Sequence, residues 1–253
     1  MQEITIHAVS EYIERLGEIN RGQRALYRGQ RRDRSLLPKI ARLTTYLPIL
    51  HVEQEFIEVF KLRSLPMLEQ PPEHEWDWLT VMQHYGLATR LLDWSINPLA
   101  ALWFCVRQPP VGNESGVVWL LHPNSDNYVV PSKQIEPTSI CKTYILRSKI
   151  IASRIRSQAG WFTAHYFNFE QDKFVALEND PAYKSRLKKL MVPFDAFARI
   201  RLELDRLDVN SSTLFPDLDG LCAHIEWIYS SLADEELQDI PKKNFPIPDN
   251  SAV

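Results

Sequence analysis

Apolar and polar positions follow two different periods along the chain, and together they predict a mixture of helices and strands. Helical spacing of apolar residues is expected over residues 10–16, 51–65, 71–86, 97–108, 182–190 and 219–232. Short apolar runs predict strands over residues 24–29, 116–122 and 142–148. Residues 197–207 alternate in a way that fits either a strand or a helix.

Helix-stopping and helix-capping residues set the expected ends of several helices. Gly17 and Gly86 are expected to stop the first and third helical patterns, and Pro66 lies just past the second. Asn97 is expected to cap the helix that follows it, with Pro98 at the first helical position. The helices and strands mix without a regular βαβ alternation, which favours an α+β fold.

The pattern as a whole predicts a single α+β domain with a mainly antiparallel sheet. The sequence contains no internal repeat, no low-complexity tract and no clear linker. We therefore expect one domain over residues 1–240. Residues 241–253 are proline-rich and polar, and are expected to form an extended tail.

Composition and charge narrow the functional classes. The 253 residues are 45% hydrophobic and 24% charged, which is ordinary for a globular protein. The net charge of −3 argues against non-specific nucleic-acid binding as the main task. No apolar run reaches the roughly 20 residues that span a bilayer, and the first residues do not resemble a secretory signal. No membrane association is therefore expected. The three cysteines are far apart, which predicts buried free thiols and a cytoplasmic protein.

Several familiar chemistries lack their motifs. The sequence has neither a Walker-type nor a dinucleotide-type glycine loop, and it has no nucleophile elbow. The seven histidines show no metal-ligand spacing, so no metal is expected. The candidate chemistry therefore lies in three clusters of polar residues that stand in apolar surroundings.

The first cluster is "LYRGQ", residues 26–30. An arginine at the end of a strand, here Arg28, suits the bidentate capture of a phosphate or a carboxylate. Gly29 would let such a ligand approach the backbone. The alternative is a surface arginine beside a turn glycine.

The second cluster lies within residues 82–104 and contains Arg90 and Asp93 among leucines. A buried charge is costly unless it is paired, so these two are expected to satisfy each other or a ligand. In an extended segment they point to opposite faces, so their pairing requires a turn; otherwise each has a separate partner. The alternative is a structural ion network that fixes the following helix.

The third cluster is residues 153–165, in which arginines and Gln158 precede Gly160, Trp161 and Phe162. Arginine and aromatic side chains together form a platform for a planar ring. The alternative is a helix that ends at Gly160, with the aromatic side chains entering the core.

The three clusters together resemble the FRG domain, a family named for its (Phe/Tyr)-Arg-Gly motif. The resemblance rests on "LYRGQ" (26–30), "QHYGLATRLLDWSINPLAALWF" (83–104) and "RIRSQAGWF" (154–162), with a weaker match in "LFPDLDGLCAHI" (214–225). The matches run in order from about residue 24 to residue 226, and the central motif is long and specific.

The "YRG" strand is also similar to the first motif of ADP-ribosyltransferases, and this similarity implies a set of roles. Arg28 would hold the pyrophosphate of NAD, and Asp93 or Gln158 would stabilise the ribose as nicotinamide leaves. Thr89 or Ser95 would orient the ribose, and Tyr85, Trp94 or Trp161 would stack on a ring. The remaining expected substrate-binding residues are Tyr27, Gln30, His84, Arg90 and Arg154. A transferase would have a glutamate where this chain has Gln158, which leaves room for NAD glycosidic cleavage or for a binding module without catalysis.

The resemblance thus implies an enzyme that acts on NAD or a related nucleotide, as a toxin or a defence effector. Two other classes remain open. A nucleic-acid or nucleotide binding module would use the basic segment 184–189 and the arginine run Arg21, Arg24, Arg28, Arg31, Arg32 and Arg34. A protein-interaction domain would use Arg90 and Asp93 only to hold its core together.

Overall fold

A four-stranded sheet forms one half of the molecule in the computed structural model, which describes residues 3–129, 135–147 and 160–243. Its strands, in spatial order, are β1 (Glu3–Thr5), β9 (Leu187–Val192), β4 (Gly116–Leu121) and β2 (Leu26–Gln30). The pair β1–β9 is parallel, and the other two pairs are antiparallel. Every residue of β4 is buried, because this strand lies inside the sheet with both of its faces covered.

Three helices cover one face of this sheet: α1 (Val9–Asn20), α4 (Pro98–Val106) and α7 (Phe197–Arg206). Helix α4 lies very close to β2, since a Cβ atom at Gly29 would be 1.8 Å from the carbonyl oxygen of Ala101. Only glycine allows this approach of backbone to backbone. The glycine after Arg28 therefore serves the packing of α4, which corrects the expectation that it leaves space for a ligand.

A second sheet forms the other half, with the strand order β3 (Leu91–Trp94), β6 (Trp161–Ala164) and β5 (Tyr144–Arg147), all antiparallel. Helices α2 (Ile49–Ser64) and α3 (Glu75–His84) pack on it around Trp76, Leu79 and Met82. The two sheets meet at an antiparallel bridge between Tyr27 and Ser95, whose N–H and C=O groups exchange hydrogen bonds of 2.7 and 2.8 Å.

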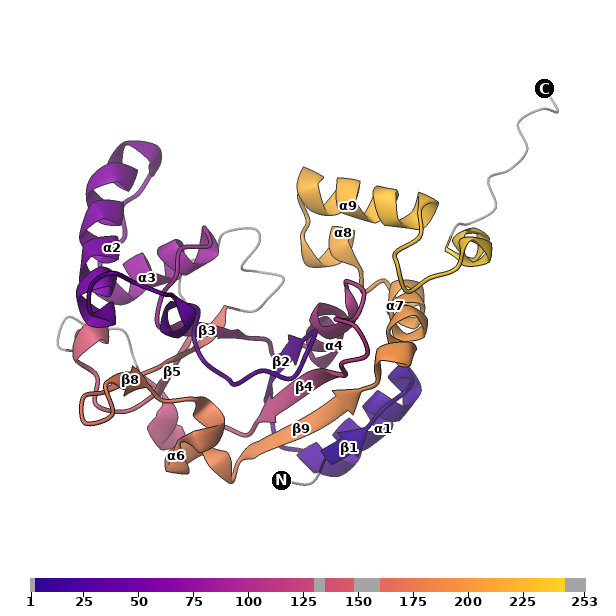
Figure 1. Cartoon of the computed structure of the whole chain (residues 1–253), viewed down its shortest axis with the longest axis horizontal. Helices are drawn as coiled ribbons and strands as arrows, with labels where there is room; N and C mark the ends of the chain where they lie inside the picture. Colours follow the sequence, from indigo (N-terminus) through magenta and orange to yellow (C-terminus); the bar gives the residue numbers. More distant parts are fainter. Residues whose placement is uncertain (1–2, 130–134, 148–159, 244–253) are drawn as a thin grey trace.

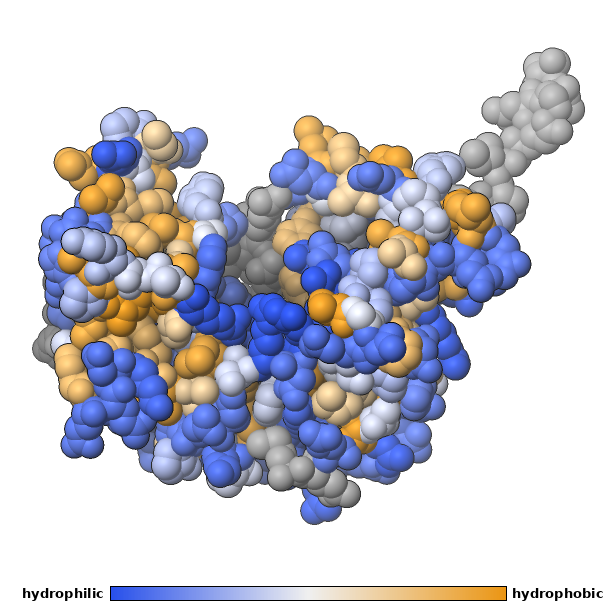
Figure 2. Space-filling model, in the orientation of Figure 1, coloured by the Kyte–Doolittle hydropathy of each residue, from blue (hydrophilic) through white to orange (hydrophobic). Residues whose placement is uncertain are grey.

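Five further α-helices and β-strands of the described residues lie around these two halves (Figure 1). They are β7 (Phe167–Asn168), β8 (Lys173–Phe174), α6 (Pro181–Lys184), α8 (Ser211–Leu214) and α9 (Leu218–Tyr229). Helices α8 and α9 stand above α4 and α7 at one end of the molecule, opposite α2 and α3. Hydrophobic side chains lie on the outer surfaces of both ends, with hydrophilic surface between them (Figure 2).

The predicted fold class is confirmed, because helices and mostly antiparallel strands form a single α+β domain. Asn97 caps α4 as expected, accepting hydrogen bonds from the N–H groups of Leu99 and Ala100. Gly86 has a φ of 82°, and the N–H of Leu87 bonds to the carbonyl of Met82, so that the glycine ends α3.

Two helix predictions need correction. Helix α1 continues through Gly17 and ends at Asn20, where Arg21 takes the left-handed conformation with a φ of 43°. The predicted helix over 182–190 is instead the short α6 followed by β9, because this strand pairs with β1 and β4 and buries Leu187, Leu190 and Val192 in the core. Residues 197–207, which fit either state, form helix α7.

The predictions for the cysteines and for the C-terminal tail can also be compared with the structure. Cys105 is buried and free, whereas Cys141 and Cys222 are exposed, so the expectation of three buried thiols is wrong for two of them. Most of the predicted tail, from residue 244 onward, lies outside the described residues. None of the helices in the described part of the chain has the length and apolar character that crossing a membrane requires.

Candidate anion-binding site

The centre of the site lies where the two sheets separate after the Tyr27–Ser95 bridge. Arg28 follows Tyr27 on β2, and Asp93 lies two residues before Ser95, on β3. The Arg28 Nη1 atom donates a hydrogen bond of 2.7 Å to the carbonyl oxygen of Asp93 and lies 3.8 Å from its carboxylate. The guanidinium group therefore spans the gap between the strands.

The polar contacts of Arg28 are incomplete. Its Nε atom is buried and has no hydrogen-bond partner among the described residues. Burial lowers the pKa of Arg28, the nearby Asp93 partly opposes this, and Arg42 adds repulsion. A buried N–H donor without an acceptor is unfavourable, and an anion that accepts from this group would remove that cost.

A chain of hydrogen bonds holds Asp93 in place. The Gln83 amide on α3 donates to the Asp93 carboxylate over 2.9 Å, and its oxygen accepts from the Thr89 hydroxyl over 2.7 Å. The same hydroxyl oxygen accepts from the N–H of Leu91 over 3.1 Å. The Asp93 side chain keeps 48% of its surface exposed, so a carboxylate with a fixed position faces solvent beside Arg28.

Three arginines lie near the buried His165 ring beside the site. His165 is fully buried, and burial lowers its pKa to about 4, with further lowering from Arg28, Arg90 and Arg42. Its Nδ1 atom lies 3.0 Å from the carbonyl of Val175, which fixes this nitrogen as the donor of the neutral ring. Because Arg90 is paired with Glu53, Arg28 and Arg42 are the two of these arginines that could attract an anionic ligand.

A cavity of about 30 Å³ adjoins Asp93. Four of its lining residues were expected at the site: His84, Asp93, Trp94 and Trp161. The others are Gln83, Gly160 and Phe162. This volume is close to that of one water molecule, so a larger ligand would lie across the opening of the cavity.

Five other expected residues have structural contacts. Tyr27 and Ser95 form the bridge between the sheets, and both are buried. The Gln30 side chain accepts a hydrogen bond of 3.3 Å from the Trp119 indole. Thr89 and Arg90 are fully buried.

Arg90 forms an ion pair in the core. Its Nε donates a hydrogen bond of 2.8 Å to one carboxylate oxygen of Glu53, and its Nη2 donates to the other oxygen. Its Nη1 donates a hydrogen bond of 2.8 Å to the carbonyl of Pro137. The guanidinium also lies 5.5 Å from the ring centre of Phe174. Arg90 and Asp93 therefore have separate partners, which was one of the two arrangements expected for an extended segment.

Tyr85 does not line the cavity, Trp94 lines it with an indole that is bonded inside the protein, and two expected residues lie outside the described residues. Tyr85 is 71% exposed and contacts His84 edge to face, with 5.0 Å between ring centres. The buried Trp94 indole donates to the Thr163 hydroxyl over 3.1 Å. Arg154 and Gln158 lie outside the described residues, so their roles remain predictions.

Two supporting residues were not selected from the sequence. Gln83 begins the central motif, and its place directly before His84 is the signal that sequence reasoning passed over. Glu53 shares a face of α2 with Ile57 and Ser64, the other buried residues of this helix. A glutamate in an apolar helical stripe signals a buried partner, and Arg90 is that partner.

The comparison with known families supports the motif assignment. The model of the FRG domain matches residues 23–114, which include Arg28, Gln83, Asp93 and helix α4. This part of the chain is an FRG domain, as its motifs indicate. The motifs at 154–162 and 214–225 lie beyond the match, and the wider limits of 1–240 stay a prediction. No curated protein and no solved structure matches the chain.

Proposed function

We propose that the Arg28–Asp93 centre binds the diphosphate and ribose of NAD or a related nucleotide and cleaves its glycosidic bond, by hydrolysis or by ADP-ribosyl transfer. One observation carries this proposal. The buried Nε atom of Arg28 has no hydrogen-bond partner among the described residues, and its guanidinium lies beside the exposed carboxylate of Asp93, whose position is fixed. An anion would complete the contacts of Arg28, and a cationic transition state would be stabilised by Asp93. A role as a toxin or a defence effector in the cytoplasm belongs to the same proposal.

The two side chains divide the work in this reaction. The bond between the ribose carbon and nicotinamide breaks, and its electron pair leaves with nicotinamide. Positive charge then develops on the ribose, where a nearby carboxylate stabilises it, as in glycosidases. A water molecule or an acceptor hydroxyl forms the new bond to carbon and loses its proton to solvent or to Asp93. The transition state thus uses an anion-binding group and a carboxylate that lie 3.8 Å apart.

The size of the cavity indicates how the ligand would lie. The phosphates would rest on Arg28, whose side chain is 21% exposed. The base or nicotinamide ring would lie over the opening lined by His84, Trp94 and Trp161. Aromatic side chains at such an opening offer stacking surfaces for a planar ring.

The test compares binding and turnover in four proteins. Thermal melting with NAD, ADP-ribose and ATP, and chromatography of released nicotinamide, are measured on wild type, Arg28→Ala, Asp93→Asn and Arg32→Ala. A ligand at about 100 times its dissociation constant adds roughly 2.7 kcal/mol of stability. Arg32 is the matched control, because it follows the same strand and its guanidinium is turned to Glu114, 4.0 Å away.

We expect Arg28→Ala to lose the melting shift with NAD and Arg32→Ala to keep it. Asp93→Asn keeps the shift but releases nicotinamide at least about tenfold more slowly, because it loses only the charge that acts in the transition state. The proposal fails if no nucleotide shifts the melting temperature of folded wild-type protein.

A protein-interaction domain is the second candidate. The specific observation in its favour is that Arg90, in the centre of the longest motif, is fully buried and paired with Glu53. At least this part of the motif serves the fold. If no nucleotide binds, the same domain would present its surface to a protein partner; nucleic acid is a weaker candidate, since the net charge is −3.

A further inference from the structure

A second, much larger cavity lies beneath helix α9. Its volume is about 580 Å³, which is in the range of small-molecule binding sites. The residues that matter for its chemistry are Trp103, Arg107, Asp205, Phe215, His224 and Trp227. None of its lining residues is shared with the cavity beside Asp93.

Helix α4 separates this cavity from strand β2. Ala101 and Cys105 of α4 lie against Gly29 of β2. Trp103 and Arg107 follow Ala101 by two and six residues, and a helix turns about 100° per residue, so they point to the other side of α4. The cavity beneath α9 is therefore distinct from the Arg28–Asp93 centre.

Helix α9 forms the roof of the cavity and is held mainly at its two ends. Gly220 is its one buried residue, and a Cβ atom there would lie 2.0 Å from the carbonyl oxygen of Phe215. The first turn of α9 therefore rests directly on α8 (Figure 1). Between its two ends the helix leaves room below it.

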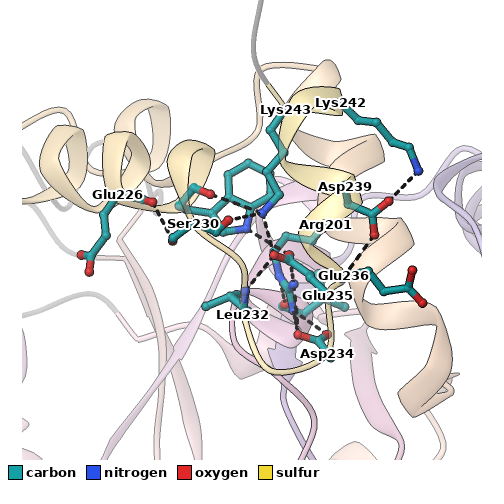
Figure 3. A network of polar contacts seen from close by, with 12 residues as sticks. Arg201, Glu226, Ser230, Leu232, Asp234, Glu235, Glu236, Asp239, Lys242 and Lys243 are labelled. Carbon is teal, nitrogen blue, oxygen red and sulfur yellow. Dashed lines mark hydrogen bonds and ion pairs between the residues drawn. The ribbon is translucent and has the colours of Figure 1, made fainter.

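A buried ionic cluster, which we call the clasp, fixes the other end of α9 (Figure 3). It consists of Arg201, Asp234, Glu235 and Lys243. The Lys243 ammonium donates a hydrogen bond of 2.8 Å to the carbonyl of Ser230 and one of 2.6 Å to the carboxylate of Glu235. It also lies 4.5 Å from the ring centre of Trp227. The Trp227 indole donates a hydrogen bond of 3.0 Å to the carboxylate of Glu235. One wall of the cavity is thus held in place before any ligand binds.

The charges around the cavity favour a cation. The two positive and two negative side chains of the clasp cancel. Asp205 and Glu226 are acidic lining residues outside the clasp, and Arg107 is a basic one. Figure 3 shows the Glu226 carboxylate projecting from the side of α9 below Ser230. Arg107 already lies on the aromatic wall, 5.7 Å from the ring centre of Trp103 and 5.5 Å from that of Phe104.

Asp205 is the acidic group best placed to bind a ligand. Its side chain is 14% exposed, and it has a neutral neighbour, since the Asn210 amide donates to it over 3.0 Å. The His224 Nε2 atom lies 3.7 Å away, too far for a strong hydrogen bond. Burial raises the pKa of Asp205 in spite of both neighbours. A cationic donor would supply the compensation that this carboxylate lacks.

We infer that the cavity beneath α9 binds a small organic cation with a flat apolar body, such as an arylalkylamine. The cationic group lies at Asp205, and the ring lies against Trp103 and Phe215, whose ring centres are 6.0 Å apart. Aromatic walls with a buried carboxylate are a general solution for organic cations. This site does not depend on the function proposed for Arg28 and Asp93.

Three probes with the same ring test the charge preference. Tryptamine is a cation, tryptophol is neutral and indole-3-propionate is an anion. Each is titrated by calorimetry into the full chain at neutral pH. We expect tryptamine to bind at least about tenfold more tightly than the other two, because a hydrogen bond between two charged groups is stronger than one with a neutral partner.

Substitutions in and outside the cavity test whether the probes bind there. Asp205→Asn should reduce tryptamine to the affinity of tryptophol, while Asp195→Asn, at an exposed position outside the lining, should leave it unchanged. Ala223→Trp fills the cavity from α9 and should abolish binding of all three probes, even if Asp205→Asn fails to fold. Arg28→Ala should bind tryptamine as wild type does.

Three results would overturn the inference. They are the absence of tryptamine binding at millimolar concentration, an affinity for indole-3-propionate equal to that for tryptamine, and unchanged tryptamine binding in a folded Ala223→Trp protein.

Discussion

Acid should unfold this protein through Glu235, the centre of the clasp. Burial alone would raise the pKa of this carboxyl, but hydrogen bonds from the N–H of Leu232, from Lys243 and from Trp227, together with the charge of Arg201, lower it from 4.5 to about 2. The side chain is 4% exposed, so solvent screens these contacts little. A shift of this size corresponds to about 3 kcal/mol of stability, at 1.36 kcal/mol per pKa unit.

The direction of the pH dependence follows from the lowered pKa. The folded state holds Glu235 charged more strongly than the unfolded state does, so the contribution is complete above about pH 5. It is lost progressively as the pH falls through 4.5 toward about 2. Glu235→Gln removes the charge at every pH, so its destabilisation should be largest near neutral pH and should shrink in acid.

Urea unfolding measured at several pH values between about 7 and 3 tests this reasoning. We expect Glu235→Gln to lose roughly 3 kcal/mol near neutral pH, within the range for a broken buried ion pair. Glu14→Gln on the exposed surface of α1 is the control and should match wild type. A difference between wild type and Glu235→Gln that stays constant with pH, or that is below about 0.5 kcal/mol, would refute the argument.

Three further outcomes follow from single contacts. Arg90→Ala should lower the free energy of unfolding by roughly 3–5 kcal/mol in a urea titration, because it leaves a buried carboxylate unpaired; a loss below about 1 kcal/mol would contradict the buried pair. Gly29→Ala should destabilise by about 1–3 kcal/mol through its clash with α4, whereas Gly17→Ala, which meets no atom within 4 Å, should stabilise by roughly 0.5–1 kcal/mol. The ring of His165 should stay neutral down to about pH 4, so its NMR signals should not shift between pH 7 and 5.

Local signals made the central part of the fold predictable. Asn97 and Pro98 specify the start of a helix through the backbone groups within one turn, and Gly86 specifies an end in the same way. These interactions need no distant partner. For that reason the sequence predicts α3 and α4 correctly, and they flank the strand β3 that carries Asp93.

Residues 182–190 show why other parts escaped prediction. The apolar spacing there fits a helix, but the segment gains more by pairing with β4, which lies about 70 residues earlier in the chain. The partners of Arg90 and Asp93 are hidden for the same reason. Glu53 and Arg28 reach them only after α2 and β2 have packed. The sequence marks which charges need partners, and the tertiary fold chooses them.

The clasp also sets a limit on how the protein can be shortened. Lys243 binds the carbonyl groups of Trp227 and Ser230 as well as Glu235, so it closes the end of α9 from 13 to 16 residues away in the chain. A deletion that begins at residue 244 leaves these contacts intact. A deletion that begins one residue earlier releases α9 from its anchor and leaves Glu235 with one cation fewer. Limited proteolysis of the two shortened forms should therefore give stable α9 in the first and cleavage near residue 230 in the second.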